Sequence, residues 1–236
     1  MRLVLFSLCF IFLFTGCTVQ QIQQTLGDVL ESDELTTDQV VSGLKEALVK
    51  GAGTSTASAS KVNGFLGNPK IKIPFPPDVK KVEDKLREIG LGSKVDEFIE
   101  TLNHGAEEAA KEAKPIFVNA ITGMTVQDAW GILKGEDNAA TQYLQSKTTA
   151  DLTAKFQPVI KQALDKTNAT KYYSDLVNTY NKIPFVDKVN PNLDEYATDR
   201  ALSGLFTLVA EEEKNIRANP AARTTELLKK VFAKQD

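Results

Sequence analysis

A glutamate interrupts the apolar face of the helix that we predict over residues 194–218. Glu213 lies about 20° from Leu202 on the helical wheel, within a face of leucine, phenylalanine, valine and isoleucine side chains. Burying a carboxylate without partners costs several kcal/mol, so partners must lie nearby. Arg217, one turn further on, is one candidate, and Arg223, beyond the turn at residues 219–220, is another.

Three uses of this cluster are open. In the first, Glu213 and the arginines form a buried ion-pair network that locks the C-terminal helices to the rest of the fold. In the second, the cluster lines a pocket, in which Arg217 or Arg223 binds an anionic ligand, or Glu213 and Glu107 bind a polar one. The third use is catalysis by a carboxyl group whose pKa is raised by burial, which requires two carboxyl groups facing one cleft.

The helix predicted over residues 94–122 carries a second set of polar residues. Asn103 and Glu107 lie one turn apart on the flank of its apolar stripe, and His104 faces away from the stripe. His104, Glu107 and Glu108 have the i, i+3, i+4 spacing that could contact one metal ion. One nitrogen ligand and two mobile, exposed carboxylates make a poor site, so we predict no metal and no cofactor. His104 is the only histidine of the chain, and a Ser-His-Asp triad would have to use it.

The N-terminus predicts export from a bacterial cytoplasm. Arg2 precedes an apolar run over residues 3–14, and such a run of about 7–15 residues ending in small residues is typical of an export signal. The run is shorter than the roughly 20 residues that cross a bilayer. The sequence Phe14-Thr15-Gly16-Cys17 resembles a bacterial lipobox, which implies cleavage before Cys17 and its acylation, for example with palmitate. An ordinary cleaved signal and an uncleaved anchor are the alternatives.

Cys17 also sets the predicted organisation of the chain. We predict a signal peptide over residues 1–16, a lipidated N-terminus and stalk over 17–34, and one helical domain over 35–236. Cys9 lies in the signal, so Cys17 has no partner for an intrachain disulfide in the mature chain. The anchor makes a membrane the first partner and places the domain in the cell envelope, facing the periplasm. Thr18 in place of an aspartate favours the outer membrane over the inner one.

The composition excludes one class of partner. The formal net charge is −3 and the sequence pI is about 5.4. A protein that binds nucleic acid needs a basic face to neutralise phosphates. We therefore predict no nucleic-acid partner.

Apolar residues recur at helical spacing along nearly the whole chain after the signal, which predicts an all-α fold made of a single compact multi-helix domain. Thr125 and Asp128 form a predicted capping box. Three prolines make residues 70–77 an extended connector. The small residues of 51–60 fit either a flexible link or a closely packed helix. The predicted helices cover residues 20–31, 37–50, 55–66, 78–89, 94–122, 126–134, 138–147, 150–167, 170–181, 194–218 and 221–234.

Short motifs that together point to one family are spread over about residues 40–232. They are Gly43 to Leu48, Ile71 to Pro74, Asn103 to Glu107, Met124-Thr125 with Asp128-Ala129 and Ile132-Leu133, Ala139 to Thr141, Gly204 to Phe206, and Glu213 with Ile216-Arg217 and Asn219-Pro220. Taken together they resemble the uncharacterised bacterial family known as domain of unknown function 4197. The resemblance implies an exported helical protein and favours a shared role for Asn103, Glu107, Glu213 and Arg217.

Three functions are compatible with these features. The first is a non-enzymatic envelope lipoprotein that binds a small ligand, a lipid or another envelope protein, with Glu213 or Arg217 at the wall of a concave apolar pocket. The second is a structural or assembly factor of the envelope, with an exposed apolar patch in place of a pocket. The third is a hydrolase that uses buried carboxylates.

Overall fold

The structure is a computed structural model, and it describes residues 36–182, 184–185, 187–223, 225, 229 and 231. These residues contain eight α-helices, two short 3₁₀ helices and no strand, so the prediction of an all-α fold is confirmed. The helices are α2 (Thr37–Ser60), η1 (Pro77–Val79), α3 (Lys80–Glu88), α4 (Gly92–Ala110), α5 (Ala113–Thr122), α6 (Val126–Leu133), α7 (Ala139–Lys166), α8 (Ala169–Tyr180), α9 (Leu193–Ala218) and η2 (Pro220–Ala222). The signal peptide, Cys17, the predicted helix over 20–31 and most of the last predicted helix lie outside the described residues.

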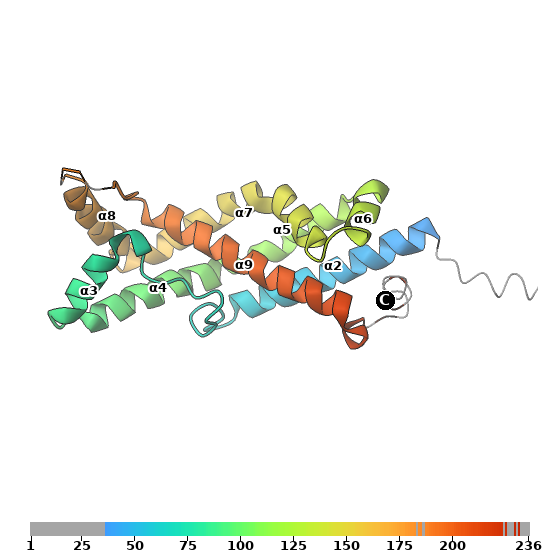
Figure 1. The fold of residues 1–236 in the computed structure, drawn as a ribbon, viewed down its shortest axis with the longest axis horizontal. Helices are drawn as coiled ribbons and strands as arrows, with labels where there is room; N and C mark the ends of the chain where they lie inside the picture. The colour runs from blue at the N-terminus through green and yellow to red at the C-terminus, as the bar shows by residue number, and fades with distance from the viewer. Residues whose placement is uncertain are drawn as a thin grey trace, which may run out of the picture. The chain divides into compact units, whose positions relative to one another are not determined.

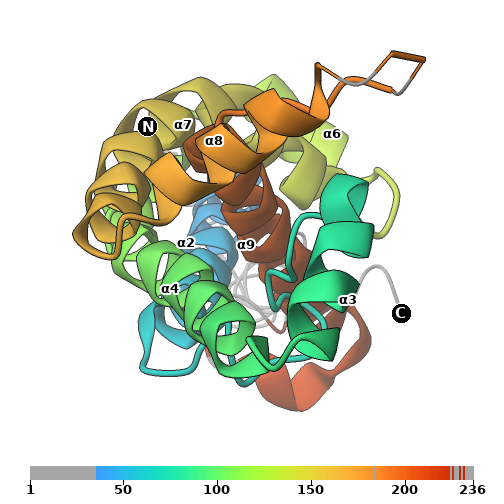
Figure 2. The same ribbon diagram turned by 90° about the vertical axis from the view of Figure 1, so that its left-hand side faces the viewer.

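Helix α9 makes the contacts that organise the other helices. It packs against α2, α4, α7 and α8, and α7 in turn packs against α4 and α5. Figure 1 shows α9 crossing α2 and α7, and Figure 2 shows it near the centre of the bundle. Leu193, Ala197, Ala201 and Leu205 of α9 are fully buried at 0% exposure, because they follow the four-residue helical repeat. Leu202, Phe206 and Val209 on neighbouring faces of α9 are buried as well, and Glu213 lies on this apolar side of the helix.

The small residues of 51–60 form a closely packed helix rather than a flexible link. They are the C-terminal half of α2, which packs against α9. A Cβ added to Gly51 would lie 3.3 Å from Cγ of Glu212, so the glycine allows the two helices to approach closely. The Ser55 hydroxyl donates a hydrogen bond across the same contact to the carbonyl of Leu208, at 3.1 Å. Helix α2 then ends at Ser60, so the predicted helix over 55–66 is wrong beyond that residue.

Two further helix boundaries differ from the predictions. The single helix predicted over 94–122 is wrong, because Lys111 and Glu112 separate α4 from α5. Pro115 explains the break, since it has no amide hydrogen to donate to the carbonyl four residues earlier. The predicted break between 147 and 150 is absent: the hydroxyls of Thr148 and Thr149 bond to carbonyls of their own helix, both at 2.6 Å, and α7 continues through them.

The start of α6 is fixed by a capping box. The Thr125 hydroxyl accepts a hydrogen bond from the Asp128 amide at 3.1 Å, and the Asp128 carboxylate accepts one from the Thr125 amide at 3.0 Å. Hydrogen bonds from the Thr125 hydroxyl and amide lower the pKa of Asp128. This cap fixes the point at which the turn after α5 ends and α6 begins.

The predicted connector over residues 70–77 is extended over 72–76, whereas Lys70 and Ile71 lie in a turn and Pro77 begins η1. Ile71, Ile73 and Phe75 are buried, and Lys70, Lys72 and Pro74 between them are exposed. This alternation of side chains is that of an extended backbone. The connector therefore places one row of side chains in the core and the other at the surface.

In the described part of the chain, none of the helices combines the length and the hydropathy that crossing a membrane demands.

Candidate functional site

The Glu213 carboxylate lies at the N-terminus of α7. It accepts hydrogen bonds from the amides of Ala140 (2.9 Å) and Thr141 (2.8 Å) and from the Thr141 hydroxyl (2.7 Å). The first amides of a helix have no partner inside the helix, and they carry a partial positive charge. A carboxylate from α9 thus caps α7 and joins the two helices at this point.

Two arginines complete the Glu213 cluster. Arg217 donates to the Glu213 carboxylate from Nε (3.1 Å) and Nη2 (2.9 Å), and also to the carbonyl of Ile132 in the last turn of α6 (2.9 Å). Arg223, which is 2% exposed, donates to the carbonyls of Ile216 (3.2 Å) and Arg217 (2.7 Å) at the end of α9. Cations are favourable at the negative end of a helix dipole. The cluster therefore holds the ends of three helices, with Arg217 paired to Glu213 and Arg223 bonded to carbonyls.

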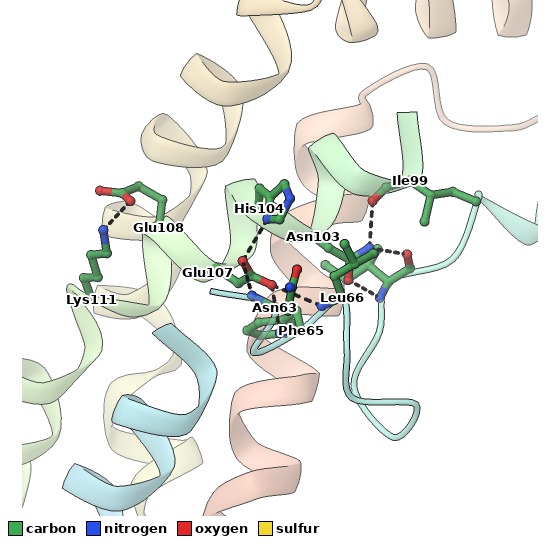
Figure 3. A network of polar contacts seen from close by, with 10 residues as sticks. Asn63, Phe65, Leu66, Ile99, Asn103, His104, Glu107, Glu108 and Lys111 are labelled. Atoms are coloured by element: carbon green, nitrogen blue, oxygen red, sulfur yellow. Dashed lines mark hydrogen bonds and ion pairs between the residues drawn. The ribbon is translucent and has the colours of Figure 1, made fainter. Parts of the chain in front are cut away.

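Asn103 of α4 holds the extended connector. Its side-chain oxygen accepts from the Ile73 amide at 2.8 Å, and its side-chain nitrogen donates to the carbonyls of Ile73 (2.8 Å) and Ile99 (2.7 Å). Figure 3 shows these bonds beside the turn that follows α2. Asn103 is completely buried. It supplies both hydrogen bonds that a neighbouring strand would give to Ile73, which is why a buried connector needs no sheet.

Glu107, one turn after Asn103, holds the turn that follows α2. One carboxylate oxygen accepts from the amides of Phe65 (3.0 Å) and Leu66 (3.1 Å), and the other accepts from the Asn63 amide (3.2 Å). His104 Nδ1 lies 2.8 Å from that second oxygen (Figure 3). Asn63 has a left-handed backbone with φ of 59°, which turns consecutive amides towards the carboxylate.

The spacing of His104, Glu107 and Glu108 does not bring three ligands together. The His104 side chain is 49% exposed and bonds to Glu107, whereas Glu108 pairs with Lys111 at 2.5 Å. Within the described ranges, no group of three histidine, cysteine, aspartate or glutamate side chains could hold a metal ion.

The five predicted polar residues form two groups, and no hydrogen bond between described residues joins one group to the other. Glu213 accepts five hydrogen bonds and Glu107 four, which uses the lone pairs of both carboxylates. A general base or a nucleophile needs an oxygen that can reach the substrate. The Glu213 group caps helix ends, and the Asn103–Glu107 group holds the connector and the turn after α2.

A groove of about 510 Å³ lies between α7 and α9, and we call it the α7–α9 groove. Its polar side chains repeat every four residues, and three apolar ones complete the lining. The lining residues are Thr141, Gln145, Thr149 and Thr153 of α7, and Asp199, Leu202, Ser203, Phe206, Thr207 and Ala210 of α9. Thr141 belongs both to the groove and to the cap made by Glu213. This site is not among the sequence predictions, although the four-residue repeat of hydroxyl and amide side chains on α7 indicates it.

Arg217 lines a second hollow of about 430 Å³ where the turn between α6 and α7 meets the end of α9. Lys134, Asp137 and Lys214 line it as well, together with Leu133, Gly135 and Ala218, so charged and apolar side chains share its wall. The Arg217 guanidinium is committed to Glu213 and Ile132, as described above. The α7–α9 groove is the larger of these two hollows.

Comparison with known proteins gives one match. Residues 34–233 match the model of the family described as protein of unknown function (DUF4197). No curated protein and no solved structure matches the chain.

Proposed function

The chain belongs to this family, and we propose that it is a non-enzymatic envelope lipoprotein whose helical domain binds a small ligand in the α7–α9 groove. The lining of the groove carries the proposal, because polar groups from two helices lie beside the apolar side chains of Leu202 and Phe206. Ligand sites are commonly hollows of about 300–1,000 Å³ with a few polar groups that fix the orientation of the ligand. The groove, at about 510 Å³, falls in that range.

The hydrogen bonds inside the groove indicate the class of ligand. The hydroxyls of Thr149, Thr153 and Thr207 donate to carbonyls of their own helices, at 2.6, 2.8 and 2.8 Å. Each therefore offers a ligand its acceptor lone pairs and its methyl group. Asp199 adds a carboxylate to the same wall. A small molecule rich in hydroxyl, amide or amine donors, with one apolar face, fits this lining.

The proposed anchor is a lipid on Cys17. Its support is the sequence alone: a basic start, an apolar run and the residues Phe14-Thr15-Gly16 before the cysteine. One acyl chain holds a protein to a membrane only weakly, and stable anchoring needs more than one. Bacterial lipoproteins carry several chains, so the domain would stay at the envelope surface, on the outer membrane in our proposal, and meet its ligand there.

The role of the buried carboxylates supports binding over catalysis. Glu107 and Glu213, the two carboxylates that a hydrolase would have used, hold backbone amides in place. The α7–α9 groove itself contains one carboxylate, Asp199. A glycosidase of the usual kind needs a pair facing one cleft.

Native mass spectrometry of the protein purified from its own host tests the proposal. We expect a bound small molecule that is retained by the wild type and lost in Thr149→Phe, because the phenyl ring would project into the middle of the groove. Thr179→Phe is the matched control, since Thr179 is also exposed on a helix and bonds to its own helix, through the Asp175 carbonyl at 2.8 Å. A bare wild-type chain, or a ligand that survives Thr149→Phe, would contradict the proposal.

A further inference from the structure

A small hollow adjoins the residues of the α7–α9 groove, and we call it the cationic hollow. It has a volume of about 90 Å³ and shares Ser203 and Thr207 with the groove. Two segments far apart in the sequence form it, the connector and α9. Its lining residues are Lys70, Ile71, Lys72, Arg200, Ser203, Gly204 and Thr207.

The lining carries an excess of positive charge. Lys70, Lys72 and Arg200 are cationic, and of these only Lys70 pairs with a carboxylate in the described residues, that of Glu211 at 2.5 Å. The Arg200 guanidinium lies 5.9 Å from the centre of the Tyr196 ring, which orients it without cancelling its charge. Lys72 and Arg200, which line the hollow, thus form no ion pair with a carboxylate among the described side chains.

The backbone of the connector at the cationic hollow is held by hydrogen bonds. Asn103 fixes the connector at Ile73, next to Lys72, and the Tyr196 hydroxyl donates to the Pro74 carbonyl at 3.1 Å. A Cβ added to Gly204 would lie 3.1 Å from Cβ of Ile71, so the glycine lets the connector lie directly against α9. The backbone that carries the lysines is therefore positioned before any ligand arrives, which lowers the entropy cost of binding.

We propose that the cationic hollow binds a phosphate group, or a similar tetrahedral oxyanion, of the ligand that occupies the α7–α9 groove. The inference rests on the proposed function, because the rest of the ligand would lie along the groove. Lys72 and Arg200 supply charged donors, and the Ser203 hydroxyl, which makes no hydrogen bond within the described part of the chain, supplies a neutral one. The volume admits one such group and little more. The ligand class is a phosphate ester with a donor-rich body, either a free ester or a lipid headgroup.

Calorimetric titration of the full chain in neutral detergent tests this assignment. The probes are inorganic phosphate, glycerol 3-phosphate and a short-chain phosphatidylglycerol, with glycerol as the uncharged control. We expect saturable binding of the phosphate compounds and none of glycerol. Lys72→Gln and Arg200→Gln should each weaken binding by about tenfold or more, the effect of removing one charge-assisted hydrogen bond.

Lys155→Gln is the matched control, because Lys155 is an exposed lysine of α7 outside both hollows. The absence of saturable binding by all three phosphate compounds would overturn the inference, and so would an equal loss in Lys155→Gln. Tighter binding of glycerol 3-phosphate identifies a soluble ester, and tighter binding of the phospholipid identifies a headgroup. Inorganic phosphate probes the cationic hollow, whereas Thr149→Phe probes the groove, so the failure of either test leaves the result of the other standing.

Discussion

Replacing Glu213 by glutamine perturbs the cap of α7 while almost preserving the size and shape of the side chain. The carboxylate accepts two bonds from the amides of Ala140 and Thr141, one from the Thr141 hydroxyl and two from Arg217. A glutamine side chain has one oxygen that accepts and one nitrogen that only donates. Whichever way it is turned, the nitrogen faces donors of Arg217 or of the helix terminus. At least two donors therefore lose their acceptor.

The expected loss of stability follows from the burial of this pair. The side chains of Glu213 and Arg217 are only 6% and 12% exposed. Breaking a buried pair by neutralising one partner costs about 3–5 kcal/mol, because the other charge stays buried. That is a large part of the roughly 5–15 kcal/mol by which domains are stable. With an m-value in urea of about 2–3 kcal/mol/M, the midpoint of unfolding should fall by roughly 1–2.5 M.

Urea unfolding followed by circular dichroism measures the effect, with Glu100→Gln as control. Glu100 is exposed on α4 and forms no ion pair in the described residues, so we expect its change to stay within about 0.5 kcal/mol. The double variant Glu213→Gln, Arg217→Met should lose less than the sum of the two single changes, because it removes the unpaired charge. A loss below about 1 kcal/mol for Glu213→Gln would refute the assignment of Glu213 as the cap.

Four further substitutions test other features of the structure. Asn103→Ala should cost about 2–4 kcal/mol in urea unfolding, because it leaves a buried amide and carbonyl of the connector unpaired; a change near zero would show that water replaces the side chain. Gly204→Ala should cost about 1–3 kcal/mol, since its Cβ would lie 2.7 Å from a ring carbon of Phe65. Gly53→Ala, with no atom within 4 Å of its Cβ, should stabilise α2 by roughly 0.5–1 kcal/mol. A Gly204→Ala variant more stable than the Gly53→Ala variant would contradict both assignments. Cys17→Ala should move the protein from the membrane to the soluble fraction, and a variant that stays with membranes would exclude the lipid anchor.

The sequence predicts those features that depend on local periodicity. The apolar repeat located the helices, and the Pro-rich segment 70–77 located the connector. The i+4 spacing also identified Arg217 as a partner of Glu213. Helix breaks were less predictable, because Pro115 interrupts the hydrogen-bond ladder near the start of α5 while Pro158 lies inside α7.

Features that depend on tertiary contacts could not be read from the sequence. Glu213 caps a helix that begins more than 70 residues earlier in the chain, and Glu107 binds amides more than 40 residues earlier. Periodicity shows that such a carboxylate faces inward, but it does not show which backbone amides it meets. The α7–α9 groove was hidden for the same reason. Each helix alone shows only a stripe of hydroxyl and amide side chains, and the hollow exists where two stripes face each other.

A crystal structure of the lipidated protein purified from its host would test ligand binding in the α7–α9 groove most directly. We expect electron density for a small molecule in the groove, between Thr149 and Ser203, with a phosphate or similar group beside Lys72 and Arg200. A groove that holds only water, or a ligand bound elsewhere on the domain, would contradict this expectation.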